Sequence, residues 1–226
     1  MTEILLKAVG LLTSFDKEVY QIILLSLVVS LSSTGISTLF GVPLGILLGN
    51  NDFPLKKIVV RMLYTAMSLP PVIVGLVVFL ILSRKGPLGF LQLNYTPLAM
   101  IIAQTLLITP IIMGIVYNRT KEDGHLIMNV GKTLGASYLQ RLILLIRELR
   151  ISIFIAIVTG YGRAVSEVGA VMIVGGNIKG HTRVMTTSIA MLKSMGDYEL
   201  AIAIGLVLLL ISFIVNAILY HFQREE

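Results

Sequence analysis

The 226-residue sequence contains no cysteine and no tryptophan, and charged residues make up only 13% of it. Without cysteine the chain has no disulfide, no thiolate metal site and no cysteine nucleophile. Without tryptophan, only tyrosine and phenylalanine remain as aromatic anchors at a membrane surface. Soluble domains carry about 25% charged residues, roughly twice the share found here. The scarcity of charge therefore argues against a soluble fold.

Apolar residues dominate instead, at 56% of the sequence, with a mean hydropathy of +0.91. A soluble protein of this size could not bury so much apolar surface, because its outside must be largely polar. The net charge of +6 is typical of loop Lys and Arg in a membrane protein. No basic stripe interleaved with aromatics indicates nucleic-acid binding.

Five apolar stretches are long enough to cross a bilayer, which takes about 20 residues. They cover residues 19–48, 58–82, 97–117, 149–174 and 200–220. The start, 1–14, is shorter and carries Lys7, so we expect a helix lying on the membrane surface there. We therefore expect an all-α membrane protein, with residues 1–226 forming one transmembrane domain of about five helices.

Glycine and proline mark special positions on the first two stretches. Gly41, Gly45 and Gly49 recur every four residues, so they share a helix face that a neighbouring backbone can approach closely. Pro70 and Pro71 lie inside the second stretch, where proline removes a backbone donor and bends a helix. Such a bend either serves helix packing or lines a pathway, and both interpretations remain open.

Three hydrophilic segments separate the stretches: 50–57, 83–95 and 118–150. The last is too polar to cross lipid and too long for a simple connector, so we expect it to dock a partner. A slight excess of Lys and Arg places it, the 50–57 turn and the C-terminus in the cytoplasm. Five spans then put the N-terminus outside.

No motif predicts an enzyme. Gly-Lys-Thr at 131–133 ends like a phosphate-binding loop, but Leu126 stands where that motif requires its first glycine. The three histidines are scattered, without carboxylates at metal-ligand spacing. We expect no catalytic residue, no cofactor and no metal.

The segment 130–141 reads Val-Gly-Lys-Thr-Leu-Gly-Ala-Ser-Tyr-Leu-Gln-Arg. It resembles the cytoplasmic coupling loop of ATP-binding-cassette importer permeases, whose short helices sit in a groove of the ATPase subunit. The resemblance implies that separate ATPase subunits, which themselves hydrolyse the ATP, dock on a coupling helix within 118–150. The implied contact residues are Gly131, Leu134, Gly135, Ala136, Ser137 and Arg141.

Two further segments are similar to the molybdate, tungstate and sulfate branch of these permeases. One is Ser-Leu-Pro-Pro-Val-Ile-Val-Gly-Leu at 68–76, and the other is Gly-Arg-Ala-Val-Ser-Glu-Val-Gly-Ala at 162–170. The amino-acid sequence from 166 to 178 is most similar to that of tungstate permeases. This implies import of a tetrahedral oxyanion, delivered by an extracytoplasmic binding protein, with molybdate or sulfate as the alternative. A single five-span chain is too small to enclose a path, so we expect a homodimer in the cell membrane.

Arg163 and Glu167 are four residues apart in an apolar stretch, so they share a helix face and can pair. Charges at such depth are costly and normally face the bundle interior. The pair either fixes helix packing, attracts the anion through Arg163, or locks a gate and exchanges partners. The other candidate pathway or gate residues are Ser68, Pro70, Pro71, Ser166 and Asn177.

The polar segment between Gly175 and Asp197 carries Lys179, His181, Arg183 and Lys193 and is expected outside. Its charge either guides an anion or meets acidic groups on the binding protein.

A rival function from another class is a secondary transporter or channel without an ATPase. That rival would need intramembrane carboxylates, and only Glu167 lies well inside a span.

Overall fold

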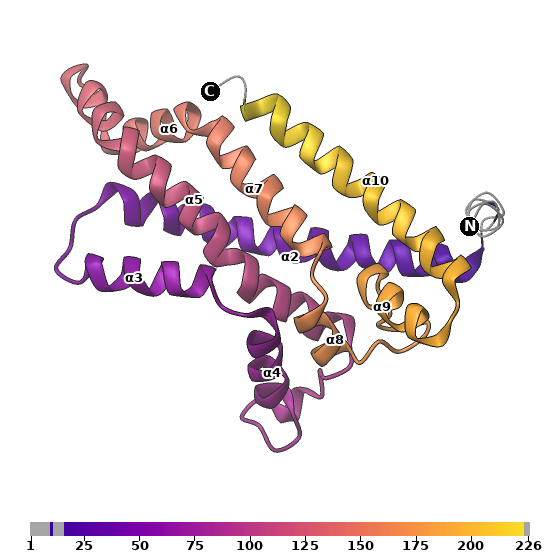
Figure 1. The fold of residues 1–226 in the computed structure, drawn as a ribbon. Coiled ribbons are helices and arrows are strands. Elements are labelled where there is room, and N and C mark those ends of the chain that lie inside the picture. Colours follow the sequence, from indigo (N-terminus) through magenta and orange to yellow (C-terminus); the bar gives the residue numbers. More distant parts are fainter. Residues whose placement is uncertain (1–9, 11–15, 224–226) are drawn as a thin grey trace.

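The computed structural model describes Gly10 and residues 16–223, and every regular element within them is a helix (Figure 1). The all-α class is therefore confirmed, whereas the surface helix expected at 1–14 lies, Gly10 apart, outside the described residues. The elements, in chain order, are α2 (Lys17–Asn50), α3 (Lys56–Met67), α4 (Pro71–Leu82), the 3₁₀ turn η1 (Gly89–Leu91), α5 (Pro97–Thr133), α6 (Tyr138–Glu148), α7 (Arg150–Val165), α8 (Gly169–Gly175), α9 (Met185–Met195) and α10 (Tyr198–Gln223).

Three helices, α2, α5 and α10, are each long and apolar enough to cross a membrane. Two further candidate spans are broken: α3 and α4 meet at 99°, and α7 and α8 meet at 57°. Counting each broken pair as one span gives up to five, in agreement with the number predicted from the sequence.

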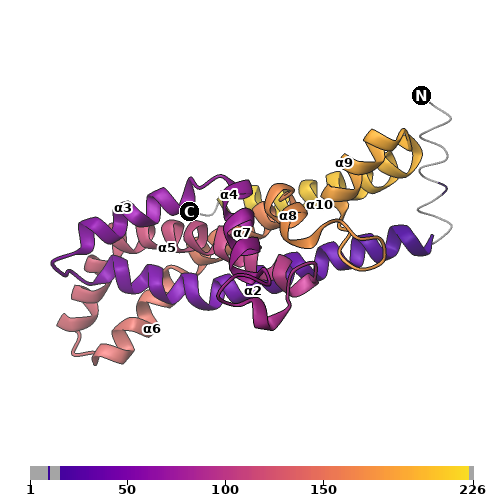
Figure 2. The ribbon, with the colours of Figure 1, turned by 90° about the horizontal axis from the view of Figure 1, so that it is seen from below.

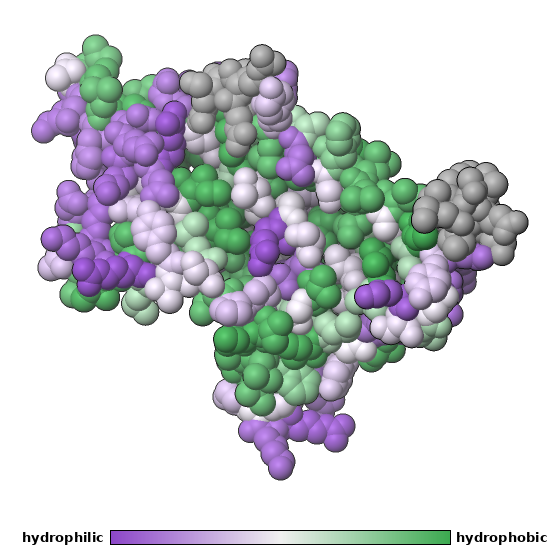
Figure 3. Space-filling model, viewed as in Figure 1, coloured by the Kyte–Doolittle hydropathy of each residue, from purple (hydrophilic) through white to green (hydrophobic). Residues whose placement is uncertain are grey.

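The two ends of the molecule differ in character. The α2–α3 connection, the end of α5 and α6 lie at one end, called the α6 end below, and the start of α2 and α9 lie at the other, the α9 end (Figures 1 and 2). Hydrophilic side chains gather at the α6 end, and hydrophobic ones cover much of the exposed face of α10 and α4 (Figure 3). α4 projects sideways from the bundle (Figure 1).

The glycine face predicted on α2 packs against α5. A Cβ added to Gly45 would lie 2.8 Å from the Met113 carbonyl oxygen, and one added to Gly49 would lie 2.6 Å from the Thr120 Cβ. Gly41 faces Ile112 in the same way, at 3.2 Å from its Cγ2. Only glycine permits this approach, so the predicted small-residue contact is confirmed.

The hydrophilic segment 118–150 begins inside a helix, because α5 continues to Thr133. Arg119 pairs with Glu122 and Asp123 at 3.5 and 3.2 Å, and these spacings stabilise a helix in water. Gly124 and Met128 are buried on the inner side. The first part of the hydrophilic segment 118–150 is therefore a solvated extension of α5, with polar residues outside and one packed face.

The non-helical segment between α5 and α6 is short. It covers residues 134–137, where Gly135 has a φ of +76° that favours glycine. Ser137 then starts α6: its hydroxyl accepts from the Gln140 N–H, and the Gln140 side chain accepts from the Ser137 N–H. This capping box fixes the direction in which α6 leaves the turn.

The polar segment after Gly175 contains a helix that the sequence analysis did not predict. In α9, Met185, Thr187 and Ser188 are buried, and the Met185 N–H donates to the Ser26 hydroxyl of α2 at 2.7 Å. Polar side chains bonded to neighbouring backbone hide the apolar periodicity by which a packed helix is normally recognised.

Candidate functional site

The first break, between α3 and α4, is built by proline. Pro71 occupies the first turn of α4, where a missing N–H is harmless, and Pro70 disfavours a helical Leu69 before it. The chain turns by 99° as a result. Ser68, Leu69 and Pro70 are exposed on the surface of the monomer.

The second break, between α7 and α8, is built by side-chain hydrogen bonds. The Ser166 hydroxyl donates to the carbonyls of Gly162 and Arg163 at 3.0 and 3.2 Å. The Glu167 carbonyl accepts from the Thr186 hydroxyl of α9 at 2.8 Å, rather than from a helix N–H. The stretch predicted as one span at 149–174 is therefore two helices.

The two breaks adjoin each other. A Cβ added to Gly75 of α4 would lie 2.6 Å from the Ala170 Cα of α8, and one added to Gly169 would lie 3.5 Å from the Val72 nitrogen. The structure thus joins the two segments, 68–76 and 162–170, that were singled out in the sequence.

Arg163 and Glu167 do pair, with 3.7 Å between a guanidinium nitrogen and a carboxylate oxygen. The expectation that one helix carries both is wrong, because α7 ends at Val165 and Glu167 lies in the break. The Glu167 side chain is only 5% exposed, against 45% for Arg163. Its other carboxylate oxygen accepts from the Ala170 N–H at 3.2 Å. Glu167 therefore holds the start of α8, and Arg163 reaches the surface.

Ser68, Ser166 and Asn177, the three polar candidates for the pathway, already have hydrogen-bond partners. The Ser68 hydroxyl donates to the Tyr64 carbonyl, and the Ser166 hydroxyl is bound as described. The Asn177 amide accepts from the Thr187 hydroxyl at 2.8 Å and donates to the Met191 sulfur at 3.2 Å. A hydroxyl has one proton to donate, so each serine must rotate before it can donate to an anion.

Gln104 is a further residue of this region that the sequence analysis missed. Its side chain is buried, accepts from the Ser33 hydroxyl of α2 at 2.8 Å, and donates to the Ala164 carbonyl of α7 at 3.0 Å. It thus links three helices just before the second break. The available signal was a lone amide inside the apolar stretch 97–117.

The turn between α5 and α6 presents an apolar projection with a packed base. Leu134 and Leu139 are 79% and 67% exposed. At the base, Arg141 lies against Gly131, where an added Cβ would be 2.8 Å from the Arg141 Cγ, and its guanidinium lies 5.7 Å from the Tyr138 ring centre. Exposed apolar residues on an ordered turn are typical of a protein-docking site.

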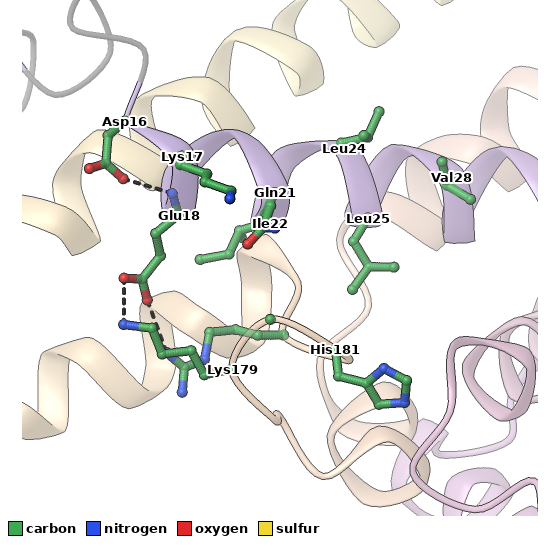
Figure 4. A pocket seen from close by; sticks show the side chains of 12 residues that line it. Asp16, Lys17, Glu18, Gln21, Ile22, Leu24, Leu25, Val28, Lys179 and His181 are labelled. Atoms are coloured by element: carbon green, nitrogen blue, oxygen red, sulfur yellow. Dashed lines mark hydrogen bonds and ion pairs between the residues drawn. The ribbon is translucent and has the colours of Figure 1, made fainter.

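At the α9 end, an open pocket of about 540 Å³ separates the start of α2 from the loop between α8 and α9 (Figure 4). Glu18 pairs there with Lys179 at 2.6 Å and with Arg183 at 3.3 Å. The ring of His181 points away from Glu18 (Figure 4). The single negative charge of Glu18 is thus shared by two of the cations noted in the sequence and offsets one of their two positive charges, which leaves less positive charge to guide an anion.

Comparison with known proteins decides the family. Residues 41–225 match the family described as binding-protein-dependent transport system inner membrane component. The chain belongs to this family. It is also 60% identical, over 96% of both chains, to the tungstate uptake system permease protein TupB of Peptoclostridium acidaminophilum.

More distant relatives of this inner membrane component are also named as permeases. A probable anion ABC transporter permease protein of Haloferax volcanii is 38% identical over 88% of both chains. The sulfate transport system permease protein CysW of Escherichia coli is 23% identical, over 93% of this chain and 76% of that one. The chain is therefore a permease component of an ABC importer, and its role is transport rather than catalysis.

Proposed function

We propose that the chain is the permease subunit of an ATP-driven tungstate importer, with the translocation pathway between two copies of the chain. The 60% identity to a tungstate permease over nearly the whole length supports the cargo. Molybdate or sulfate is the second candidate, because the CysW proteins are related at 23% identity and these oxyanions share charge and shape.

The observation that carries the pathway is the exposure of Arg163, which lies near the end of α7 in a candidate membrane span. Its side chain is 45% exposed in the monomer, and the exposed Ser68, Pro70 and Ser166 belong to the two adjoining breaks. A charged side chain and broken backbone do not face lipid in a stable membrane protein. We therefore assign this face to a water-filled path that a second copy closes on the other side.

The proposed pathway residues are Ser68, Pro70, Pro71, Arg163, Ser166, Glu167 and Asn177. Within them, Arg163 would attract the dianion, and the buried Glu167 would hold the second break in place. While Arg163 pairs with Glu167, the two charges offset each other. If Arg163 moves away, the free carboxylate repels an anion, so the pair is also suited to close the path between transport cycles.

The proposed ATPase contact is the exposed turn from Gly131 to Arg141. We assign it to the cytoplasm, with the N-terminus outside and the C-terminus inside, on the slight excess of Lys and Arg at that end. An extracytoplasmic binding protein would then dock at the α9 end. A secondary transporter fits less well, since it would leave the exposed apolar turn without a partner.

Reconstitution tests the function directly. The chain is incorporated into proteoliposomes with its candidate ATPase and binding protein, and ATP hydrolysis and anion uptake are measured with tungstate, molybdate, sulfate or no anion. We expect tungstate with the binding protein to stimulate both. Hydrolysis that ignores the binding protein and the anion would refute the importer, and a preference for molybdate or sulfate would refute only the cargo.

Replacing Arg163 with Gln tests the pathway in the same system. We expect uptake to fall about tenfold or more while binding-protein-stimulated hydrolysis persists, because the loss removes charge from the path and not from the docking surfaces. Arg84→Gln, at the exposed tip beyond α4, is the matched control. Equal uptake by the two variants would place the path elsewhere.

A further inference from the structure

A second open pocket, of about 670 Å³, lies at the α6 end between the α2–α3 connection, α3 and α5. It has no part in the proposed pathway or the proposed ATPase contact. Its lining contains four cations and one carboxylate, which are Lys56, Lys57, Arg61, Lys121 and Asp52.

The carboxylate neutralises only one of the four cations. Lys56 donates to Asp52 at 3.0 Å and to the Gly49 carbonyl at 3.4 Å, and this hydrogen bond lowers the pKa of Asp52, so that the pair stays ionised. Lys57, Arg61 and Lys121 form no ion pair with any residue in the described part of the chain. Three uncompensated positive charges therefore border one pocket.

These charges are held by two helices. Lys57 and Arg61 are one turn apart on the same face of α3, and Lys121 approaches from α5. Tyr64, one turn further along α3, donates its hydroxyl to Asn118 of α5 at 2.6 Å and so ties the two walls together. The pocket is thus formed by packed helices rather than by a loose loop.

A strip of exposed apolar side chains lies beside the cations on α3. Ile58 and Met62, which directly follow Lys57 and Arg61 in the sequence, are 54% and 68% exposed. The opposite side of the helix, including Leu63, packs into the bundle. A cationic site next to a strip of exposed apolar side chains, on a helix of a candidate membrane span, matches the chemistry of an anionic phospholipid: a phosphate joined to acyl chains.

We propose that this pocket binds the headgroup of an anionic phospholipid from the surrounding bilayer. The phosphate lies among Lys57, Arg61 and Lys121, and the acyl chains run along Ile58 and Met62. Basic pockets between transmembrane helices recognise anionic headgroups in this way, and each cation near the headgroup contributes about fivefold to affinity. The site steadies α3 relative to α5, just before the first break.

Lipid binding to the purified full-length chain tests the proposal without nucleotide or transported anion, so its outcome is independent of the transport function. Native mass spectrometry measures binding of phosphatidylglycerol and phosphatidylcholine, and a thermal unfolding assay follows the Tm with each lipid. We expect phosphatidylglycerol to bind more tightly and to raise the Tm more.

The triple variant Lys57→Gln, Arg61→Gln, Lys121→Gln should weaken phosphatidylglycerol binding roughly a hundredfold and leave phosphatidylcholine binding unchanged. The control variant Arg84→Gln, Lys85→Gln, Lys193→Gln removes the same charge from exposed positions away from the pocket and should bind as the wild type does. Asp52→Asn, which frees Lys56, should tighten binding by a few fold. Asp52→Asn raises the positive charge of the pocket and the single variant Lys121→Gln lowers it, so their opposite effects on binding keep the proposal testable if the triple variant fails to fold.

Three results would overturn the proposal. Equal losses in the triple and control variants would mean general charge attraction with no site. Equal protection by inorganic phosphate would identify a site for free anions rather than for lipid. A triple variant that changes from dimer to monomer without changing lipid affinity would identify a contact between copies.

Discussion

Gly75 of α4 packs directly on Ala170 of α8, so that a Cβ added to Gly75 would lie 2.6 Å from the Ala170 Cα. The contact is backbone against backbone and joins the two broken spans. Neither side has a flexible side chain that could give way. The relative position of the two breaks therefore depends on a missing methyl group.

Replacing Gly75 with Ala should lower the free energy of unfolding by about 1–3 kcal/mol, because overpacking at a rigid contact forces the helices apart. Thermal unfolding in detergent measures this. Gly35→Ala is the matched control: a Cβ at Gly35 meets nothing within 4 Å, and alanine favours a helix by up to about 1 kcal/mol. If both substitutions proved neutral, the contact between α4 and α8 would have to be looser than described.

Gln104→Leu should cost about 2–4 kcal/mol, because it leaves the Ala164 carbonyl and the Ser33 hydroxyl without their buried partner. Gln104→Glu keeps the acceptor for Ser33 but loses the donor to Ala164, and should also be destabilising. Ser33→Ala removes a hydroxyl whose single proton is shared between Gln104 and the Ser30 carbonyl, and it leaves Gln104 bonded to Ala164, so it should cost only about 1 kcal/mol. Chemical unfolding of the three variants in the same detergent compares them, and a Gln104→Leu variant as stable as Ser33→Ala would contradict the bridging role.

Glu167→Gln should impair assembly or coupling, and Arg163→Met together with Glu167→Gln should recover part of the loss. The recovery should be modest, at about 1 kcal/mol or less, because Arg163 is half exposed and the ions are 3.7 Å apart. Arg163→Met alone should be less stable than the double variant, since it leaves a buried carboxylate without its charge partner and, unlike Arg163→Gln, offers it no hydrogen bond. A double-mutant cycle on unfolding and on ATPase stimulation measures the coupling, and strict additivity would show that the two charges do not interact.

Gly135→Arg should leave the protein in the membrane but abolish co-purification with the ATPase. Any side chain at φ +76° is strained, although a Cβ there meets nothing within 4 Å. Gly135→Asn separates the two effects, because asparagine tolerates this backbone conformation and lacks the bulk and charge of arginine. The asparagine variant should therefore retain the complex. Retention by the arginine variant as well would refute the docking assignment.

Local rules predicted much of the fold. The spacing of Gly41, Gly45 and Gly49 predicted a face on α2 for close helix packing, although not that α5 is the partner, and Pro70 predicted the first bend. Both effects arise from the backbone of the residues themselves, so that no tertiary information was needed.

The errors fell where distant contacts decide. The break at Glu167 depends on the Thr186 hydroxyl, 19 residues further along the chain, and Gln104 acquires its role only from Ser33 and Ala164. The helix α9 is polar in sequence although it is packed, because its buried hydroxyls have partners: Thr186 donates to the Glu167 carbonyl and Ser188 donates to the Val184 carbonyl. A single sequence does not reveal which distant residues will become hydrogen-bond partners, whereas hydrophobic periodicity and proline positions can be recognised in it directly.

The unbroken course of α5 has a mechanical consequence. Its 37 residues form a rod about 55 Å long, which runs from the neighbourhood of η1 to the Gly135 turn, and Pro110 is the only proline in its interior. A rod of this length, tilted by about 5° at one end, displaces the other by roughly 5 Å. A small rotation imposed at the turn would thereby produce a displacement at the far end of α5 about as large as the rise of one helical turn.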